Sequence, residues 1–312
     1  MKFFITGIEG FVGHYLAQDL LSKGHQVGGS YIDTQAASDL AGKYKLYLVD
    51  LRRPDQIDDA VKDFCPRTIF HLAAQSSPAL SFKKPQETFE INLIGTVNLL
   101  ESLRAVKDKC RLVLVSSCEV YGPTGSDQPL SETQVYNPIS PYASSKVFQE
   151  ITCLQYHKTY GLDAVVARPF PHTGPGQPPS FAMPSFARQI AEIEQGKKEA
   201  VIKVGNLSAR RDISDVRDVV QAYRLLAEKG RSGEIYNICS GQTIRMEDAL
   251  KKLLQLSSKD VRIETDPELL RPADVPVLWG DNKKIKSDTG WEQKYNLDQT
   301  LAGLLQHWRG KV

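Results

Sequence analysis

The feature that most constrains the fold is an alternation of short β-rich runs with longer helical patterns through the first 170 residues. It begins with an apolar run at Lys2–Thr6, which is followed by a helical pattern over Phe11–Ser22. Strands separated by helices favour parallel pairing through right-handed crossovers. The sequence therefore predicts an α/β fold with a doubly wound parallel Rossmann sheet. Further strands are predicted at 26–32, 45–50, 68–73, 111–116 and 163–168, and helices after Pro54, near 86–106 and over Pro141–Tyr160.

The pattern changes after Arg168. Six prolines lie in the stretch 169–184, which predicts a loop throughout it. Beyond this stretch, a helix at Val216–Lys229 and a strand at 233–239 are expected to return to the sheet. We therefore expect a dinucleotide-binding Rossmann domain at 1–170 plus about 212–240. The rest, about 171–211 and 241–312, is expected to form a smaller, mixed α/β substrate-binding lobe.

Composition excludes several classes of function. The formal charge is only +2 over 312 residues, which gives no support to nucleic-acid or membrane-surface binding. No run approaches the roughly 18 apolar residues that a membrane span needs. The five cysteines are scattered and form no C-x-x-C pair, so we expect reduced thiols, no metal site and a cytoplasmic location.

Three glycines follow the first predicted strand. Gly7, Gly10 and Gly13 allow a tight turn and a close approach of backbone to a ligand, while Phe11 and Val12 open the helix. A helix N-terminus presents unpaired N–H groups and the positive end of the helix dipole to an anion. These residues are therefore predicted to bind the pyrophosphate of a dinucleotide cofactor.

The ends of the next strands are the other places where such a sheet binds its cofactor. Asp33 lies 20 residues beyond Gly13 and is a candidate for the ribose hydroxyls. No arginine occurs at 30–34 to accept a 2′-phosphate, which favours NAD(H) slightly and leaves NADP(H) open. Candidates for the adenine and the nicotinamide riboside are Asp50, Leu51, Leu72, Ala73 and Ala74.

Tyr142 and Lys146 lie four residues apart at the start of a predicted helix, which places them on one face of it. A neighbouring ammonium is expected to lower the pKa of the tyrosine, which can then exchange a proton with a substrate carbonyl. Ser117, at the end of a predicted strand, supplies a hydroxyl for the same carbonyl. Lys146 is also a candidate for holding the ribose of the cofactor.

The order of these motifs resembles that of the extended short-chain dehydrogenase/reductases, also called the NAD-dependent epimerase/dehydratase family. The resemblance covers essentially the whole chain and is strongest toward GDP-4-keto-6-deoxy-D-mannose reductases and GDP-mannose 4,6-dehydratases. The segments that carry it are HLAAQSS at 71–77, RPFPHTGPGQ at 168–177, SFARQIA at 185–191, RRDISDVRDVVQAY at 210–223, GEIYNICSG at 233–241 and LLRPADVPVLWGD at 269–281.

The resemblance implies an NAD(P)-dependent oxidoreductase acting on a GDP-sugar, with Ser117, Tyr142 and Lys146 as its catalytic residues. The main reading is reduction of the C4 keto group of a GDP-4-keto-6-deoxy-hexose, of the type that converts GDP-4-keto-6-deoxy-D-mannose to GDP-D-rhamnose. The alternative is a GDP-mannose 4,6-dehydratase, which needs a further acid/base. Glu119 stands where dehydratases keep a glutamate base, but Cys118 stands where some sugar dehydratases carry an aspartic acid.

Substrate contacts are expected from the second lobe and from the strand ends. A guanidinium can bind phosphate oxygens in a bidentate manner, which suits a GDP-sugar. Pro171 replaces an asparagine that the family usually keeps for the sugar or diphosphate, and His172 is a candidate substitute. The expected substrate-binding residues are Gln75, Ser117, His172, Arg188, Arg211 and Arg271.

Two other functions fit the same fold. A nucleotide-sugar 4-epimerase would use the same three catalytic residues with a retained NAD. A non-catalytic dinucleotide sensor would not need the Tyr142–Lys146 pair. The resemblance also implies a homodimer, formed through the predicted helices near 86–106 and 141–160.

Overall fold

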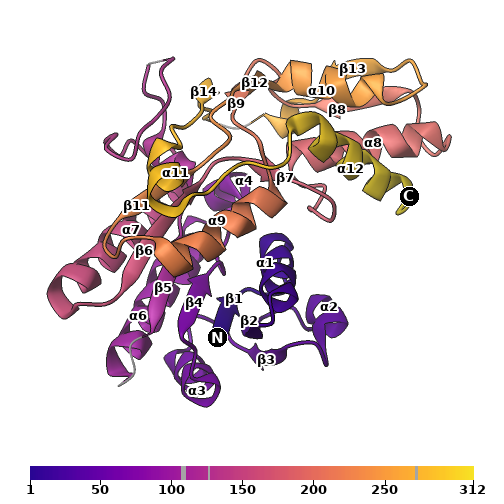
Figure 1. The fold of residues 1–312 in the computed structure, drawn as a ribbon. Helices are drawn as coiled ribbons and strands as arrows, with labels where there is room; N and C mark the ends of the chain where they lie inside the picture. The colour runs from indigo at the N-terminus through magenta and orange to yellow at the C-terminus, as the bar shows by residue number, and fades with distance from the viewer. Residues whose placement is uncertain (107–109, 126, 271–272) are drawn as a thin grey trace.

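The computed structural model describes residues 1–106, 110–125, 127–270 and 273–312. Its centre is a parallel sheet of seven strands in the order β11-β6-β5-β4-β1-β2-β3 (Figure 1). The strand order reverses between β1 and β4, which is where such sheets bind ligands. The predicted doubly wound parallel sheet is therefore confirmed. Its strands are β1 (Lys2–Thr6), β2 (Gln26–Tyr31), β3 (Lys45–Leu48), β4 (Thr68–His71), β5 (Arg111–Val115), β6 (Ala164–Pro169) and β11 (Ile235–Ile238).

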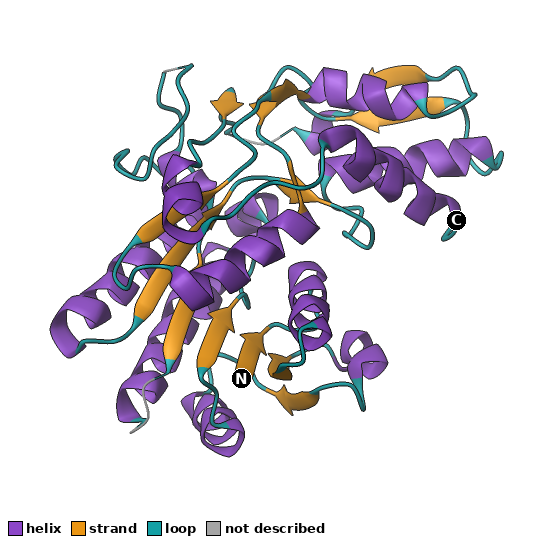
Figure 2. Cartoon of the chain, viewed as in Figure 1, coloured by secondary structure: helices purple, strands orange, loops and turns teal. Residues whose placement is uncertain are grey.

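Helices cover both faces of the sheet (Figure 2). Side chains alternate along β1, so Phe3 and Ile5 face one layer while Phe4 faces the other. The first layer contains α1 (Phe11–Ser22), α9 (Val216–Lys229) and α11 (Lys283–Thr289). The opposite layer contains α3 (Pro54–Phe64), α6 (Gly95–Ala105) and α7 (Pro141–Tyr160). Short helices complete this part of the chain at α2 (Thr34–Ala37), α4 (Pro78–Lys83) and α5 (Pro85–Phe89).

A second core lies beyond the carboxyl ends of the strands, at the upper right of Figure 1. Apolar faces of three helices pack there against a two-stranded sheet, and a three-stranded sheet runs beside them in the order β12-β9-β14. Its helices are α8 (Ala182–Glu194), α10 (Met246–Gln255) and α12 (Leu297–Arg309). Its strands are β8 (Val201–Val204), β13 (Arg262–Thr265), β9 (Arg210–Arg211), β12 (Ile244–Arg245) and β14 (Val277–Leu278).

The prediction of an uninterrupted loop over 169–184 is wrong. A short strand, β7 (His172–Thr173), pairs with β10 (Ser214–Asp215) inside this stretch, and α8 begins at Ala182. Pro184 occupies the third position of that helix, where a backbone N–H has no partner in a preceding turn. Proline is therefore tolerated there, although the proline count of the segment pointed to a loop.

The predicted helix near 86–106 is confirmed as a continuous run of helical backbone, but it contains a π-helical turn. A π-helical turn, Glu90–Ile94, separates α5 from α6. The turn places the buried Asn92 side chain toward α7, where it donates to Ser145 Oγ at 2.9 Å. π-helical turns occur often at functional sites because they redirect single side chains.

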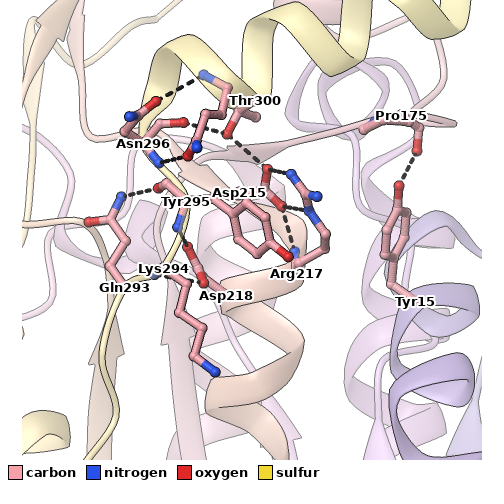
Figure 3. A network of polar contacts seen from close by, with 11 residues as sticks. Tyr15, Pro175, Asp215, Arg217, Asp218, Gln293, Lys294, Tyr295, Asn296 and Thr300 are labelled. Carbon is pink, nitrogen blue, oxygen red and sulfur yellow. Dashed lines mark hydrogen bonds and ion pairs between the residues drawn. The ribbon is translucent and has the colours of Figure 1, made fainter. Parts of the chain in front are cut away.

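The segment 283–300 ties the second core to the sheet. Ile285 and Trp291 belong to the core under α1 and α9, so this part of the expected second lobe packs on the sheet itself. Asp218 of α9 accepts hydrogen bonds from two backbone N–H groups of the segment, and Asp215 accepts one from Thr300 Oγ1 at 2.8 Å (Figure 3). Two buried carboxylates at the start of α9 thus anchor the chain that enters α12.

In the described part of the chain, no helix combines the length and the apolar character that crossing a membrane requires.

Candidate active site

The loop between β1 and α1 is shaped by its glycines. Gly7 has φ +70°, and its position lies against Ala73, so both residues predicted for the cofactor meet here. A Cβ added to Gly13 would lie 2.3 Å from Gly7 O. Gly10 caps α1 without a side-chain hydrogen bond, which leaves the first-turn N–H groups of Phe11, Val12 and Gly13 for a ligand. The loop therefore forms a cradle suited to a pyrophosphate.

The acids predicted for the adenosine end already have partners. Asp33 caps α2 and accepts from two backbone N–H groups through Oδ1. Asp50 accepts from Arg52 through both carboxylate oxygens, and this contact holds the pKa of Asp50 below its usual range. Leu51 is buried against α6. The carboxylates do lie at the ends of β2 and β3. Both oxygens of Asp50 are engaged by Arg52, whereas the capping bonds of Asp33 use Oδ1 alone.

Ser117, Tyr142 and Lys146 come together at the end of β5. Tyr142 and Ser117 are within hydrogen-bonding reach, and both are more than nine-tenths buried. Lys146 lies one turn after Tyr142 on α7, with its Nζ 5.9 Å from the centre of the Tyr142 ring. The same Nζ donates to Val115 O, the last carbonyl of β5, at 2.9 Å. The spacing in α7 and the end of β5 thus build one buried group.

The expectation that Lys146 lowers the pKa of Tyr142 is wrong for this structure. Burial dominates and raises the pKa of the phenol above its ordinary value, while the Ser117 hydroxyl opposes that rise. The Lys146 ammonium points to the Val115 carbonyl instead of the phenol oxygen. A phenol with a raised pKa stays protonated at neutral pH, so Tyr142 holds the proton that reduction of a carbonyl consumes.

Glu119 lies in the 3-10 turn that follows Ser117. Its backbone N–H donates to Ser117 Oγ at 3.2 Å, and its charge raises the pKa of Tyr142. Cys118 lies between Ser117 and Glu119, and burial raises the pKa of its thiol well above the usual value. Cys118 therefore stays a neutral thiol at neutral pH and is a weaker acid than a carboxyl group.

A buried polar chain that the sequence did not reveal connects the glycine loop to α7. Thr6, just before Gly7, bonds to His71 Nδ1 at 2.9 Å, and His71 Nε2 bonds to Thr96 Oγ1 at 2.9 Å. Burial lowers the pKa of His71 to about 3, so its ring is neutral. Because Thr96 donates its own proton to Asn92 O, His71 Nε2 carries the hydrogen in this pair. Asn92 donates in turn to Ser145 Oγ of α7, so this chain of bonds fixes the cofactor loop relative to the catalytic helix.

The residues predicted to bind substrate fall into different surroundings. Gln75 is engaged by Ser77 of its own loop and by Thr88 of α5. His172 Nδ1 donates to Phe170 O at 2.9 Å, which leaves Nε2 as the acceptor of the ring. Arg188 is exposed on α8 and pairs with Glu192. Ser117 belongs to the catalytic group described above, and Arg271 lies outside the described residues.

Arg211 stands beside a pocket of the second lobe. Its Nη2 donates to Asp274 Oδ1 at 2.6 Å, and Asn206 holds the other oxygen of that carboxylate at 3.0 Å. The pocket has a volume of about 370 Å³ and is lined by Gly205, Asn206, Leu207, Thr265, Leu270 and Asp274. Asp274 and the backbone of 205–207 are site candidates that the sequence did not single out. Among the described residues, no group of three or more His, Cys, Asp or Glu side chains is placed to hold a metal ion.

A Rossmann sheet with a glycine cradle at its switch point and a Ser–Tyr–Lys group beside it defines an extended short-chain dehydrogenase/reductase. The chain belongs to the GDP-mannose 4,6-dehydratase family, whose model matches residues 4–304.

Similar proteins include reductases and epimerases of nucleotide sugars. A GDP-6-deoxy-D-mannose reductase of Pseudomonas aeruginosa is 35% identical over 100% of this chain and 98% of its own length. The structure of RMD from P. aeruginosa complexed with NADPH has a TM-score of 0.87 and 33% identity, and covers 100% of this chain and 99% of its own. A UDP-glucose 4-epimerase of Thermus thermophilus in complex with NAD has a TM-score of 0.91 at 27% identity, with complete coverage of both chains.

Proposed function

We propose that this protein is an NAD(P)H-dependent reductase of the C4 keto group of GDP-4-keto-6-deoxy-D-mannose, with a product of the GDP-D-rhamnose type. The observation that carries the proposal is the buried Ser117–Tyr142–Lys146 group beside the glycine cradle, with the weakly acidic Cys118 between Ser117 and Glu119. The 35% identity to a GDP-6-deoxy-D-mannose reductase over the whole chain supports it.

The cradle fits a dinucleotide. A side chain at Gly13 would fill it, and the first turn of α1 offers backbone N–H groups to a pyrophosphate. Asp33 uses only Oδ1 for its capping bonds, so Oδ2 can accept from a ribose hydroxyl. When bound, the cofactor supplies the hydride. The relatives bind NADPH or NAD, and this chain is proposed to use one or both.

The side chains then have distinct tasks. Tyr142 donates its phenol proton to the C4 carbonyl oxygen, and the Ser117 hydroxyl donates a hydrogen bond to the same oxygen. Both groups act in a site that is largely shielded from water, where such bonds are stronger than in solution. Lys146 stabilises the phenolate that forms and holds the ribose of the cofactor.

The nucleotide of the substrate is proposed to occupy the pocket beside Arg211. Leu207 and Leu270 offer apolar surface to a base, and Asp274 offers acceptor oxygens. A guanidinium has five N–H donors. In Arg211, Nη1 donates to Arg210 O and Nη2 donates to Asp274 Oδ1. The remaining donors suit the diphosphate.

Replacing Arg211 by methionine is expected to raise the KM for the GDP-sugar by about tenfold to a hundredfold, since charged hydrogen bonds are lost. The turnover number should change little, because Arg211 lies outside the group that moves the proton. Steady-state kinetics with saturating cofactor measures both constants. The matched variant Arg188→Met removes an exposed arginine of α8 and is expected to have a smaller effect. An unchanged KM for Arg211→Met would place the diphosphate elsewhere.

A dehydratase is the second candidate, favoured by the position of Glu119 near Tyr142. The Glu119→Gln variant separates the two. In a reductase, this variant should retain the turnover number within about threefold, because the reaction removes no C5 proton and so needs no general base at that place. A loss of about a hundredfold or more, with intact folding by circular dichroism, would instead indicate the dehydratase.

The direct test uses two parallel assays of the purified protein. The first contains GDP-4-keto-6-deoxy-D-mannose with NADH or NADPH, and the second contains GDP-mannose with NAD or NADP. Stoichiometric oxidation of the cofactor in the first assay, with a product two hydrogens heavier, is expected. Loss of one water from GDP-mannose without net cofactor consumption would identify a dehydratase.

A homodimer is also proposed. Ile94, Phe148 and Ile151 are each about half exposed on the π-helical turn and α7, and the last two share one helix face. A second copy of the same surface would cover them. The five free cysteines, four of them buried, fit the proposed cytoplasmic location.

A further inference from the structure

The glycine loop carries an acidic residue that contacts the next strand. Glu9 lies in the turn between β1 and α1, and its Oε1 accepts a hydrogen bond from Ile32 N, directly after β2, at 2.9 Å. The loop itself is fixed to the same strand, because Gly7 N and Ile8 N donate to Ser30 O at 2.9 Å and 3.0 Å. The Glu9 carboxylate is therefore held at the carboxyl end of β2, within the loop proposed for the pyrophosphate.

The surroundings of Glu9 are poor in positive charge. Its Oε2 is buried and has no hydrogen-bond partner in the described part of the chain. Lys23 is the only lysine or arginine in the stretch 3–42, which contains β1, α1, β2 and α2. It follows the last turn of α1, away from the glycine loop, and its Nζ lies 3.8 Å from Asp19 Oδ1. This stretch therefore brings no cation to the end of β2.

The cations that follow this stretch lie beside acids of their own. Three of them form ion pairs, which are Lys45–Asp63, Arg52–Asp50 and Arg53–Asp55. Burial lowers the pKa of His14 on α1, Lys43 lowers it further, and Asp39 opposes the effect. Lys43 and Asp39 thus act on the same ring with opposite charges. These cations are partly neutralised within the protein itself.

Asp33 adds a second carboxylate at the end of β2, where its Oδ1 caps α2. In dinucleotide-binding sheets, an acid at this strand end accepts a hydrogen bond from the 2′-hydroxyl of the adenosine ribose. NADP carries a phosphate on that oxygen, which removes the donor and adds up to two negative charges. A second acid held at the same strand end therefore matters most for the choice between the two cofactors.

We propose that Glu9 is a specificity-determining residue of the cofactor site, which disfavours the 2′-phosphate of NADP(H) and so selects NAD(H). The inference rests on the proposed role of the glycine cradle in holding the pyrophosphate. Specificity of this kind comes from an unfavourable contact with the wrong ligand, here the repulsion between a carboxylate and a phosphate. NAD(H) is thus the cofactor of this chain, although one similar structure contains NADPH.

Binding measurements without any sugar test this directly. In fluorescence titrations of the wild type, the dissociation constant for NADPH should exceed that for NADH by about tenfold or more, the size that Coulomb's law gives for a doubly charged phosphate near a carboxylate in water. In Glu9→Gln, which keeps an acceptor for Ile32 N, the constant for NADPH should fall by about tenfold. The constant for NADH should change by less than about threefold. Added salt should narrow the ratio of the two constants more in the wild type than in the variant, because salt screens the repulsion.

Matched variants separate the charge of Glu9 from its other effects. Glu9→Asp keeps the charge and should keep the preference for NADH. Asp59→Asn removes an exposed acid of α3 and should leave both constants within about twofold of the wild type. Equal or tighter binding of NADPH by the wild type would overturn the proposal, and so would an unchanged ratio in Glu9→Gln. The titrations contain no GDP-sugar, so a protein that binds NADH but shows no reductase activity would count against the proposed function alone.

Discussion

Tyr142→Phe is expected to lower the turnover number by about a hundredfold to ten-thousandfold, the usual contribution of a positioned acid. The variant loses the phenol proton that the site places next to Ser117 for transfer to the carbonyl oxygen. The ring stays in its buried position, so the fold and the cofactor site should be preserved. Cofactor affinity by fluorescence titration should therefore equal that of the wild type while the single-turnover rate falls.

The matched control is Tyr47→Phe. Tyr47 lies on the edge strand β3, and its hydroxyl bonds to Asp63 at the surface. Its removal should leave turnover within about twofold of the wild type, as expected for a surface group away from the chemistry. Near-wild-type turnover in Tyr142→Phe would remove Tyr142 from the proposed mechanism, whatever the substrate proves to be.

The parts of the fold that could be predicted are those with a local pattern. The strands of the sheet were located to within a few residues because each is a short apolar run followed by a helical period. The π-helical turn at Glu90–Ile94 could not be predicted, because no proline or glycine within it marks the change in helical geometry. The start of α8 was missed because the prolines of its approach outweighed the apolar pattern that begins at Ala182.

In the candidate site, too, the features with a local sequence pattern could be predicted and those that depend on packing could not. The Tyr142–Lys146 pair follows from i, i+4 geometry, and Ser117 follows from its place at a strand end. The direction of the Lys146 ammonium could not be read in this way, because it depends on the carbonyl of a different strand. The burial of Tyr142 and Lys146, which shifts the pKa values of both side chains, is likewise a property of the assembled core.

Long-range polar partners remained hidden for a related reason. Glu150 lies at the next i, i+4 position after Lys146, but its partner Arg168 is on β6 and its partner Ser116 follows β5. Asp274 meets Arg211 across 63 residues of sequence. Nothing in the local composition distinguishes such buried acids from solvated ones, so only the packed structure identifies them.

Gly13→Ala is expected to be the most damaging small substitution in the cofactor loop. The added Cβ would lie 2.3 Å from Gly7 O and 2.9 Å from Ile8 Cα and Ile8 O, all of them backbone atoms that cannot rotate away. The turn and the first residues of α1 must then move apart, and overpacking of this kind costs about 1–3 kcal/mol. The N–H groups aimed at the pyrophosphate move with them.

Cofactor affinity should consequently fall by about tenfold to a hundredfold or more, which corresponds to about 1.4–2.8 kcal/mol. Gly10→Ala is the matched control in the same loop, since its Cβ would lie 3.3 Å from Gly7 O and needs only a small adjustment. Gly24→Ala supplies the second control: its φ of +75° strains an alanine, but no atom lies within 4 Å and the cofactor loop is not involved. Gly24→Ala should lower the melting temperature without changing affinity. If Gly13→Ala remained folded and bound the dinucleotide as tightly as the wild type, the cradle between β1 and α1 would not be the pyrophosphate site, and the proposed assignment of the cofactor would have to be abandoned.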